Sequence, residues 1–117
     1  MPFKFESLNI WKKSLELSVE IDGLAKLFPK WEMFNLCSQV RRASDSVVLN
    51  IAEGCTGQTS PEFKRFLNYS IRSGIEVVSC LFIAKRKGYL QEDTFTKYYN
   101  EYEVLIKMIT SFRDKLS

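Results

Sequence analysis

The sequence predicts an all-α protein, an antiparallel up-down-up-down four-helix bundle that occupies residues 1–117 as a single domain. Three observations lead to this prediction. Four segments repeat apolar residues at spacings of three, four and seven, which is the periodicity of one face of a helix. No segment alternates apolar and polar residues long enough to indicate a strand. The links between the segments are short, which favours antiparallel neighbours.

The first helix is expected at about residues 7–28. Ser7 is the predicted N-cap. Pro29 should end the helix, because the residue before a proline is pushed out of the helical region. The apolar face of this helix comprises Ile10, Leu17, Ile21, Leu24 and Phe28.

The second helix should begin between Lys30 and Glu32 and stop at Gly54, since glycine is common at helix C-termini. The connection at 55–59 contains a glycine and two threonines, and we expect it to be exposed. The apolar stripe of the second helix comprises Met33, Leu36, Val40, Ala43, Val47 and Ile51.

The third helix, about residues 61–87, is the longest. Ser60 should cap it and Gly88 should end it. Gly74 lies on its core line, where a glycine costs about 1 kcal/mol relative to alanine. We therefore expect a close helix crossing at that position. The fourth helix shows regular heptads through Phe95, Tyr98, Tyr102, Leu105, Ile109, Phe112 and Leu116.

Composition excludes several classes of protein. The chain has no histidine, which removes the commonest general base and the imidazole ligands of most zinc sites. Its three cysteines are odd in number and widely spaced, so we expect free, buried thiols rather than disulfides or a metal site. We expect no catalytic residue, no cofactor and no metal, and hence no enzyme.

The uncharged runs of the sequence, such as 77–84, are far shorter than the roughly 20 residues that span a bilayer. Residues 1–6 lack the apolar core of a signal peptide. We therefore expect a cytoplasmic protein without a membrane partner. The net charge is +3, but residues 30–90 hold nine Lys/Arg against five Asp/Glu. This basic middle is compatible with nucleic-acid binding.

The first candidate site is a basic row on the third helix. Arg65, Arg72 and Arg86 are spaced at multiples of seven residues, and Lys64, Lys85 and Lys87 flank them. Such a row suits contacts with the phosphates of a nucleic acid. The alternative is a solvated helix face with local ion pairs, for instance Arg72 with Glu76.

The second candidate is the pair Arg41 and Arg42. Arg41 can pair with Asp45 one turn away. Arg42 has no acidic residue one turn away, so it is free to reach a phosphate or to cross a subunit interface. We favour an interface role for the pair.

Asn50 and Glu53 are the other interface candidates. Glu53 lies in the last turn of its helix, where the helix dipole disfavours a negative charge. We expect an arginine such as Arg65, on the same or a neighbouring chain, to offset it. A single carboxylate without a second acid or base does not indicate catalysis.

Aromatic residues are a further signal. Tyr98, Tyr99 and Tyr102 have rings that could stack on unpaired bases. Tyr98 and Tyr102 lie on the core line of the fourth helix, however, which favours packing. Trp31, just after Pro29, is expected to be exposed or to lie at a contact between subunits.

Several of these residues form a recognisable motif. Trp11, the arginine pair at 41–42, the Asn-Ile-Ala-Glu-Gly box at 50–54 and the Glu-Phe-x-Arg-Phe-Leu box at 62–67 occur in that order. In this respect the chain resembles the small four-helix-bundle proteins encoded in intervening sequences of bacterial 23S ribosomal RNA genes. It is also similar to the accessory proteins of diversity-generating retroelements.

The resemblance implies a homopentamer shaped like a short tapered barrel, with no enzymatic activity. The retroelement relatives bind nucleic acid and a reverse transcriptase. Two departures from the family pattern are Val48, where a proline is usual, and Arg72, where a glycine is usual. Val48 removes a potential kink from the second helix. Arg72 places a long charged side chain where helices approach closely in the relatives.

Self-association is expected on physical grounds as well. The third helix has a second apolar line that one bundle core cannot bury. We therefore expect an oligomeric, non-enzymatic protein that binds RNA or DNA, RNA being favoured. The alternative is an adaptor for a protein partner, such as a reverse transcriptase, without direct nucleic-acid contact. The second line comprises Ile71, Ile75, Val78 and Phe82.

Overall fold

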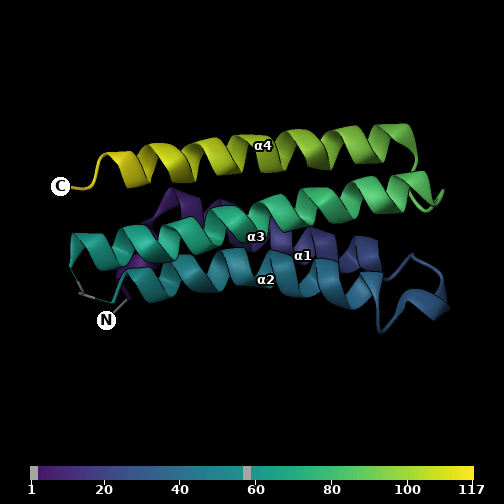
Figure 1. The fold of residues 1–117 in the computed structure, drawn as a ribbon, viewed down its shortest axis with the longest axis horizontal. Coiled ribbons are helices and arrows are strands. Elements are labelled where there is room, and N and C mark those ends of the chain that lie inside the picture. The colour runs from purple at the N-terminus through teal and green to yellow at the C-terminus, as the bar shows by residue number, and fades with distance from the viewer. Residues whose placement is uncertain (1–2, 57–58) are drawn as a thin grey trace.

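Four long helices carry the chain back and forth along one axis, and the prediction of an all-α four-helix bundle is confirmed (Figure 1). The computed structural model describes residues 3–56 and 59–117, and these contain no strand. Positions 57–58 of the predicted exposed connection lie outside the described residues. The elements are η1 (Lys4–Ser7), α1 (Asn9–Ala25), η2 (Lys30–Glu32), α2 (Leu36–Gly54), α3 (Ser60–Arg86) and α4 (Glu92–Asp114).

The start of α1 differs from the prediction. The helix begins at Asn9, and Leu8 is its N-cap, with an extended backbone and no side-chain cap hydrogen bond. The prediction of Ser7 as the cap is wrong, because the Ser7 hydroxyl donates to the carbonyl of Lys4 at 3.0 Å inside the preceding 3₁₀ turn.

The first helix also ends earlier than predicted. After Ala25, the amides of Leu27 and Phe28 bond to carbonyls three residues back, so the chain tightens before Pro29 is reached. This tightening seats Phe28 in the core. The predicted start of the second helix at 30–32 is instead the separate turn η2, and the α-helix begins at Leu36.

The contact between α2 and α3 is the closest in the bundle. Gly54 ends α2 as predicted, but it is also buried against the other motif box. A Cβ at Gly54 would lie 2.7 Å from Phe63 Cδ1 and 2.9 Å from Phe66 Cβ. The two boxes of the motif are therefore packed on each other, and only glycine leaves room for the aromatic rings.

Small polar residues continue this seam along the helices. The hydroxyl of Ser70 donates to the carbonyl of Val47 at 2.9 Å. The hydroxyl of Ser73 donates to that of Ser46, also at 2.9 Å. Serine is short enough to let the backbones approach, and each buried hydroxyl has a partner, which removes the cost of its desolvation.

Both ends of α3 follow from local sequence. Its N-cap is Thr59 rather than the predicted Ser60, and the Thr59 hydroxyl accepts from the amide of Glu62 at 3.3 Å. At the other end Gly88 has φ +82°. The amide of Tyr89 bonds back to the carbonyl of Ala84 at 2.8 Å, as in a Schellman motif.

The predicted close crossing at Gly74 is confirmed. A Cβ there would lie 3.1 Å from Ile106 Cγ1 of α4. Arg72, in contrast, is exposed. The expectation that Arg72 disturbs a close approach of helices is wrong, because the approach occurs two residues later and on the opposite side of α3.

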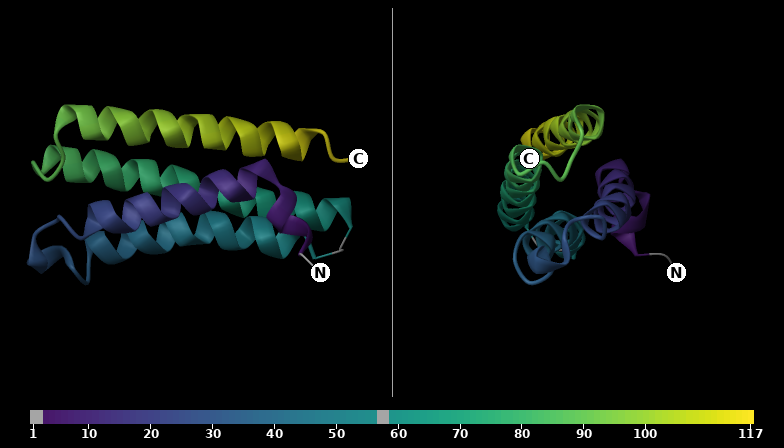
Figure 2. Two further views of the ribbon diagram at one scale, coloured as in Figure 1. Left: turned by 180° about the vertical axis from the view of Figure 1, so that it is seen from behind. Right: turned by 90° about the vertical axis from the view of Figure 1, so that its right-hand side faces the viewer.

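The core runs the length of the bundle and includes most of the predicted apolar lines. The placement of Met33 in the stripe of the second helix is wrong, because α2 begins only at Leu36 and Met33 is 51% exposed in the preceding connection. Tyr98 and Tyr102 are buried, as predicted from their heptad positions. The helices are not equally close: α1 packs mainly on α2 and α4 mainly on α3, while α1 and α4 diverge (Figure 2). The largest fully buried side chains are Tyr102, Leu17, Ile21, Ile51, Leu67, Leu81, Leu105 and Ile109.

The molecule is elongated, with extents of 44 × 24 × 21 Å. Both ends of the chain lie at one end of the bundle, and the α1–α2 and α3–α4 connections lie at the other (Figure 1). Among the described residues, α3 alone is long and apolar enough to span a membrane by composition. It packs between α2 and α4, and the core helix of a soluble protein meets the same criterion.

Replacement of Gly54 tests the contact between the two boxes. We expect Gly54→Ala to destabilise the fold by about 1–3 kcal/mol in urea unfolding, because the new methyl group forces Phe63 and Phe66 away. The matched control is Gly23→Ala in α1, where a Cβ meets nothing within 4 Å. That change should stabilise the protein by up to about 1 kcal/mol. Equal effects from the two substitutions would contradict the close contact.

Candidate nucleic-acid interface

The basic row of α3 lies on the side of the helix that faces away from the bundle core. Arg65, Arg72 and Arg86 are all exposed, while the core line of α3 is buried on the opposite side. Of the flanking lysines, Lys87 is exposed and Lys64 and Lys85 are half-buried. The sequence therefore placed the arginines on a common outer face correctly.

Three of the six basic side chains are engaged by carboxylates. Arg65 pairs with Glu62, one turn earlier on α3. Lys85 pairs with Glu92 of α4 at 2.7 Å. Lys87 pairs with Glu32 at 2.9 Å. A phosphate would have to compete with these carboxylates.

The other three basic side chains have no ion-pair partner within 4.0 Å in the described part of the chain. They are Arg72, Arg86 and Lys64. The alternative interpretation, a pair between Arg72 and Glu76, is not found there. Because a free guanidinium presents all its N–H donors to solvent, Arg72 and Arg86 are the side chains best prepared to bind an anion.

Arg41 and Arg42, the two arginines predicted to lie at an interface, have different environments. The Arg41 guanidinium bonds Asp22 of α1, with Nε 2.7 Å from Oδ1. The expected pair with Asp45 is wrong, because Asp22 reaches Arg41 across the α1–α2 contact. Asp22 also holds Lys26, at 3.3 Å. Arg42 is exposed, as predicted, beside a hollow of about 410 Å³.

Asn50 and Glu53 stand apart from the basic row. The amide of Asn50 donates to both the carbonyl and the hydroxyl of Ser46, each at 2.9 Å. Asn50 thus belongs to the polar seam between α2 and α3. Glu53 is exposed, and Arg65 of the same chain is occupied by Glu62. The intrachain form of the predicted Glu53 pair is therefore wrong, and the interface roles of Asn50 and Glu53 stay predictions.

The sequence missed the best-defined polar cluster of the molecule. The carboxylate of Glu32, in the turn η2, is almost completely buried. It accepts hydrogen bonds from Tyr89 Oη at 2.7 Å, Lys87 Nζ at 2.9 Å and Asn35 Nδ2 at 3.1 Å. We call Glu32, Lys87 and Tyr89 the latch, since they join the α1–α2 connection to the α3–α4 turn.

Hydrogen bonding determines the charge state of the latch. The hydrogen bonds from Tyr89 and Lys87 lower the pKa of Glu32 from 4.5 to about 2, despite its burial. The bond to Glu32 raises the pKa of both Lys87 and Tyr89. Glu32 is therefore ionised throughout the physiological pH range, and its charge is neutralised inside the protein.

The remaining predicted features are structural. All three cysteines are buried and free, as expected, and burial raises the pKa of the Cys80 thiol to about 11. Tyr98 donates to Glu20 at 3.0 Å, whereas the buried Tyr102 hydroxyl has no hydrogen-bond partner among residues 3–56 and 59–117. The position of Trp31 outside the core is confirmed, since its side chain is 78% exposed.

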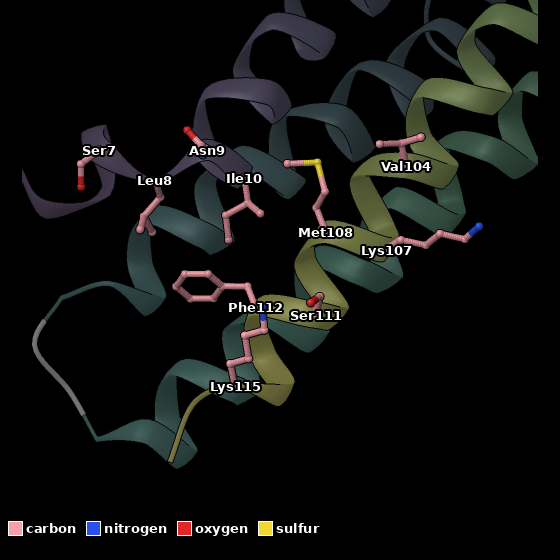
Figure 3. Close-up of a pocket in the computed structure, with 10 residues that line it drawn as sticks. All are labelled: Ser7, Leu8, Asn9, Ile10, Val104, Lys107, Met108, Ser111, Phe112 and Lys115. Carbon is pink, nitrogen blue, oxygen red and sulfur yellow. The ribbon is translucent and has the colours of Figure 1, made fainter.

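A groove opens where α1 and α4 diverge. It has a volume of about 620 Å³ and lies between the start of α1 and the last turns of α4. Figure 3 shows Phe112 of α4 facing Leu8 and Ile10 across this space. Lys107 and Lys115 also line the groove. The groove lies at the end of the molecule opposite to the latch.

Removal of the Glu32 charge tests the latch. Because the pKa of Glu32 is lower in the folded than in the unfolded chain, its ionisation stabilises the fold above about pH 5, and this stabilisation is lost as the pH falls toward 2. We expect Glu32→Gln to lower the melting temperature near neutral pH. The difference from the unchanged protein should shrink as the pH falls from about 5 to 2.

The matched control for this prediction is Glu16→Gln, which replaces an exposed carboxylate of α1. Its effect on the melting temperature should be small at every pH, because an exposed carboxylate without a partner contributes little. A pH-independent difference for Glu32→Gln would contradict the ionised latch.

Comparison with known proteins agrees with the fold and the motif. A solved structure of a protein with unknown function from the S23 ribosomal protein family of Bacteroides thetaiotaomicron is similar, with a TM-score of 0.84 and 24% identity. The match covers 91% of this chain and 96% of that one, and at this identity it shows the fold alone. No curated protein matches. The family described as 23S rRNA-intervening sequence protein matches residues 6–111, so the chain belongs to that family.

Proposed function

We propose that this protein is a non-enzymatic, oligomeric nucleic-acid-binding protein of the cytoplasm whose α3 helix contacts the phosphates of RNA. The observation that carries the proposal is the pair Arg72 and Arg86. Both are exposed on the outer side of α3, and neither has a carboxylate partner in the described residues. Guanidinium groups of this kind bind phosphate with two N–H donors at once.

The spacing of the two arginines defines how RNA would lie. Fourteen residues of helix separate Arg72 from Arg86, which corresponds to about 21 Å along α3. One nucleic acid reaches both side chains only if it runs roughly parallel to the helix. At about 3.4 Å of axial rise per nucleotide, six to seven nucleotides span the distance. An RNA of about twelve nucleotides is therefore a sufficient probe.

An apolar surface beside the row supports self-association. The side chains of Ile75 and Phe82 are 56% and 51% exposed. Phe82 contacts Phe95 and Tyr99 of α4, with ring centroids 4.8 and 6.0 Å apart. The surface thus covers the α3–α4 seam, and a hollow of about 250 Å³ lies there. Apolar side chains this exposed favour burial against another protein surface.

A second copy of the chain is the occupant we propose for this seam. The family resemblance implies five copies in a ring. Each copy would add another basic row, so weak phosphate contacts would act together on one RNA. Lys85 of the row pairs with Glu92 of α4 and so belongs to the seam, whereas Arg72 is exposed on the outer side of α3. A copy that covers the seam would therefore leave Arg72 accessible.

The alternative function is an adaptor for a protein partner such as a reverse transcriptase. A separate apolar surface favours it: Phe34, Leu27 and Met33 are 91%, 79% and 51% exposed in the α1–α2 connection. Aromatic residues, methionine and arginine are enriched in protein interfaces, and Arg42 lies beside Phe34 and Met33. Absence of RNA binding even at low salt would favour this function.

Removal of the free arginines tests the phosphate contacts. We expect Arg72→Ala with Arg86→Ala to weaken binding of a labelled 12-nucleotide RNA, measured by fluorescence anisotropy across a salt series. The slope of log K against log salt should fall by about 0.7–0.9 for each lost contact. The control Lys12→Ala removes an exposed cation from α1 and should leave the slope unchanged. An unaltered slope in the double variant would exclude the α3 row.

A charge placed in the α3–α4 seam tests the oligomer. We expect Ile75→Asp to shift the protein toward the monomer in sedimentation equilibrium, because burying an unpaired carboxylate costs several kcal/mol. Val19→Asp, at a 66% exposed position of α1, is the matched control and should leave the mass unchanged. Dissociation by Val19→Asp alone would place the interface on α1 instead.

A further inference from the structure

Trp31 is exposed yet held in one orientation. Its indole N–H donates to Tyr89 Oη at 3.3 Å, and Tyr89 Oη in turn donates to the buried Glu32 carboxylate at 2.7 Å. The Tyr89 ring packs on Phe28, with centroids 5.6 Å apart. The polar edge of the indole is therefore fixed to the bundle while 78% of the side chain is open to solvent.

The latch joins this ring to the end of the basic row. Lys87, which holds Glu32, directly follows Arg86 in the chain. Both connections lie at the same end of the bundle (Figure 1). A nucleic acid whose phosphates follow α3 from Arg72 to Arg86 therefore reaches the end of the bundle at which Trp31 lies.

Charge at this end suits an anionic chain. Lys30, adjacent to Trp31, is exposed and has no ion-pair partner in the part of the chain that the structure describes. The carboxylate of Glu32 is removed from the surface and neutralised by Lys87. Of the two acids in the first turn of α4, Glu92 is engaged by Lys85, and Asp93 is exposed. Lys30 and Arg86 are two exposed cations at this end without an ion-pair partner among the described residues.

We propose that Trp31 is a stacking platform for an unpaired base of a single-stranded RNA whose phosphates follow α3. A large aromatic face next to cations binds bases without regard to sequence, since every base has a π-face. The hydrogen bond from the indole N–H to Tyr89 orients the ring before binding, so little entropy is lost when a base stacks on it. The adjacent exposed cation Lys30 favours a nucleic acid, whose phosphates it can contact, over an apolar protein pocket. This inference rests on the proposed function, and it specifies that the RNA bound at the same site is single-stranded.

Affinity measurements with two probes test the platform. The probes are a 12-nucleotide oligo(A) and a 12-base-pair RNA duplex, whose bases are already stacked. Trp31→Ala should weaken oligo(A) binding by about 5- to 150-fold, the range for loss of one stacked base. Duplex affinity and the salt dependence of both probes should stay unchanged, because the phosphate contacts remain.

Three further variants separate stacking from other effects. Trp31→Phe should recover part of the oligo(A) affinity. Tyr89→Phe keeps the ring on Phe28 but removes the hydroxyl that orients the indole, and should give a smaller loss than Trp31→Ala. Phe34→Ala is the matched control, since Phe34 is 91% exposed in the same connection but is not held by the latch. Equal losses in Phe34→Ala and Trp31→Ala would overturn the proposal.

Fluorescence provides an independent readout. The chain has two tryptophans, so Trp11→Phe leaves Trp31 as the sole reporter. Saturable quenching by oligo(A), but not by the duplex, is the expected result. Oligo(A) binding without quenching would overturn the proposal. So would a blue shift on phosphatidylcholine vesicles containing phosphatidylglycerol together with no response to oligo(A), which would assign Trp31 to a membrane surface.

The outcomes also distinguish this inference from the proposed function. Binding of neither RNA at low salt would overturn both. Duplex binding that depends on Arg72 and Arg86, combined with full oligo(A) affinity in Trp31→Ala, would overturn the stacking platform alone.

Discussion

The contact between Gly54 and the two phenylalanines of α3 is the constraint on which the rest of the structure depends. Because no side chain intervenes, Phe63 and Phe66 rest directly against the end of α2. This contact determines the rotation of α3 about its own axis. Once that rotation is set, Leu67 and its heptad partners enter the core. Arg65, Arg72 and Arg86 lie on the other side of the helix and face outward, so packing between the two motif boxes also orients the basic row of α3.

Local patterns predicted the parts of the fold that depend on a single helix. Apolar periodicity identified the four helices and their buried faces, including Tyr98 and Tyr102. Glycine marked both the end of α3 at Gly88 and the crossing with α4 at Gly74. Helix starts were less accurate. The chain tightens after Ala25 and forms the turn η2 because Phe28 and Glu32 are buried there. Apolar periodicity carries no information about this burial.

In the candidate site, too, local features were predictable and contacts between elements were not. The outward position of Arg65, Arg72 and Arg86 followed from spacing, and the pair between Arg65 and Glu62 is local. The partners of Arg41 and Lys87 were not predictable, because Asp22 and Glu32 reach them from other elements. The sequence predicted only that the second helix begins between Lys30 and Glu32. The burial of Glu32 at the contact of two connections is a tertiary property, and this contact engages Lys87 of the basic row.

The two ends of the bundle carry different features. The two ends of the chain lie at one end of a bundle 44 Å long, beside the groove between α1 and α4, while the latch and Trp31 lie at the other end. Affinity tags, fluorophores or solid supports attached at Ser117 are thereby separated from the latch by nearly the full length of the bundle. Immobilisation through the C-terminus consequently leaves the latch end facing solution, and a fused domain there would not shield it.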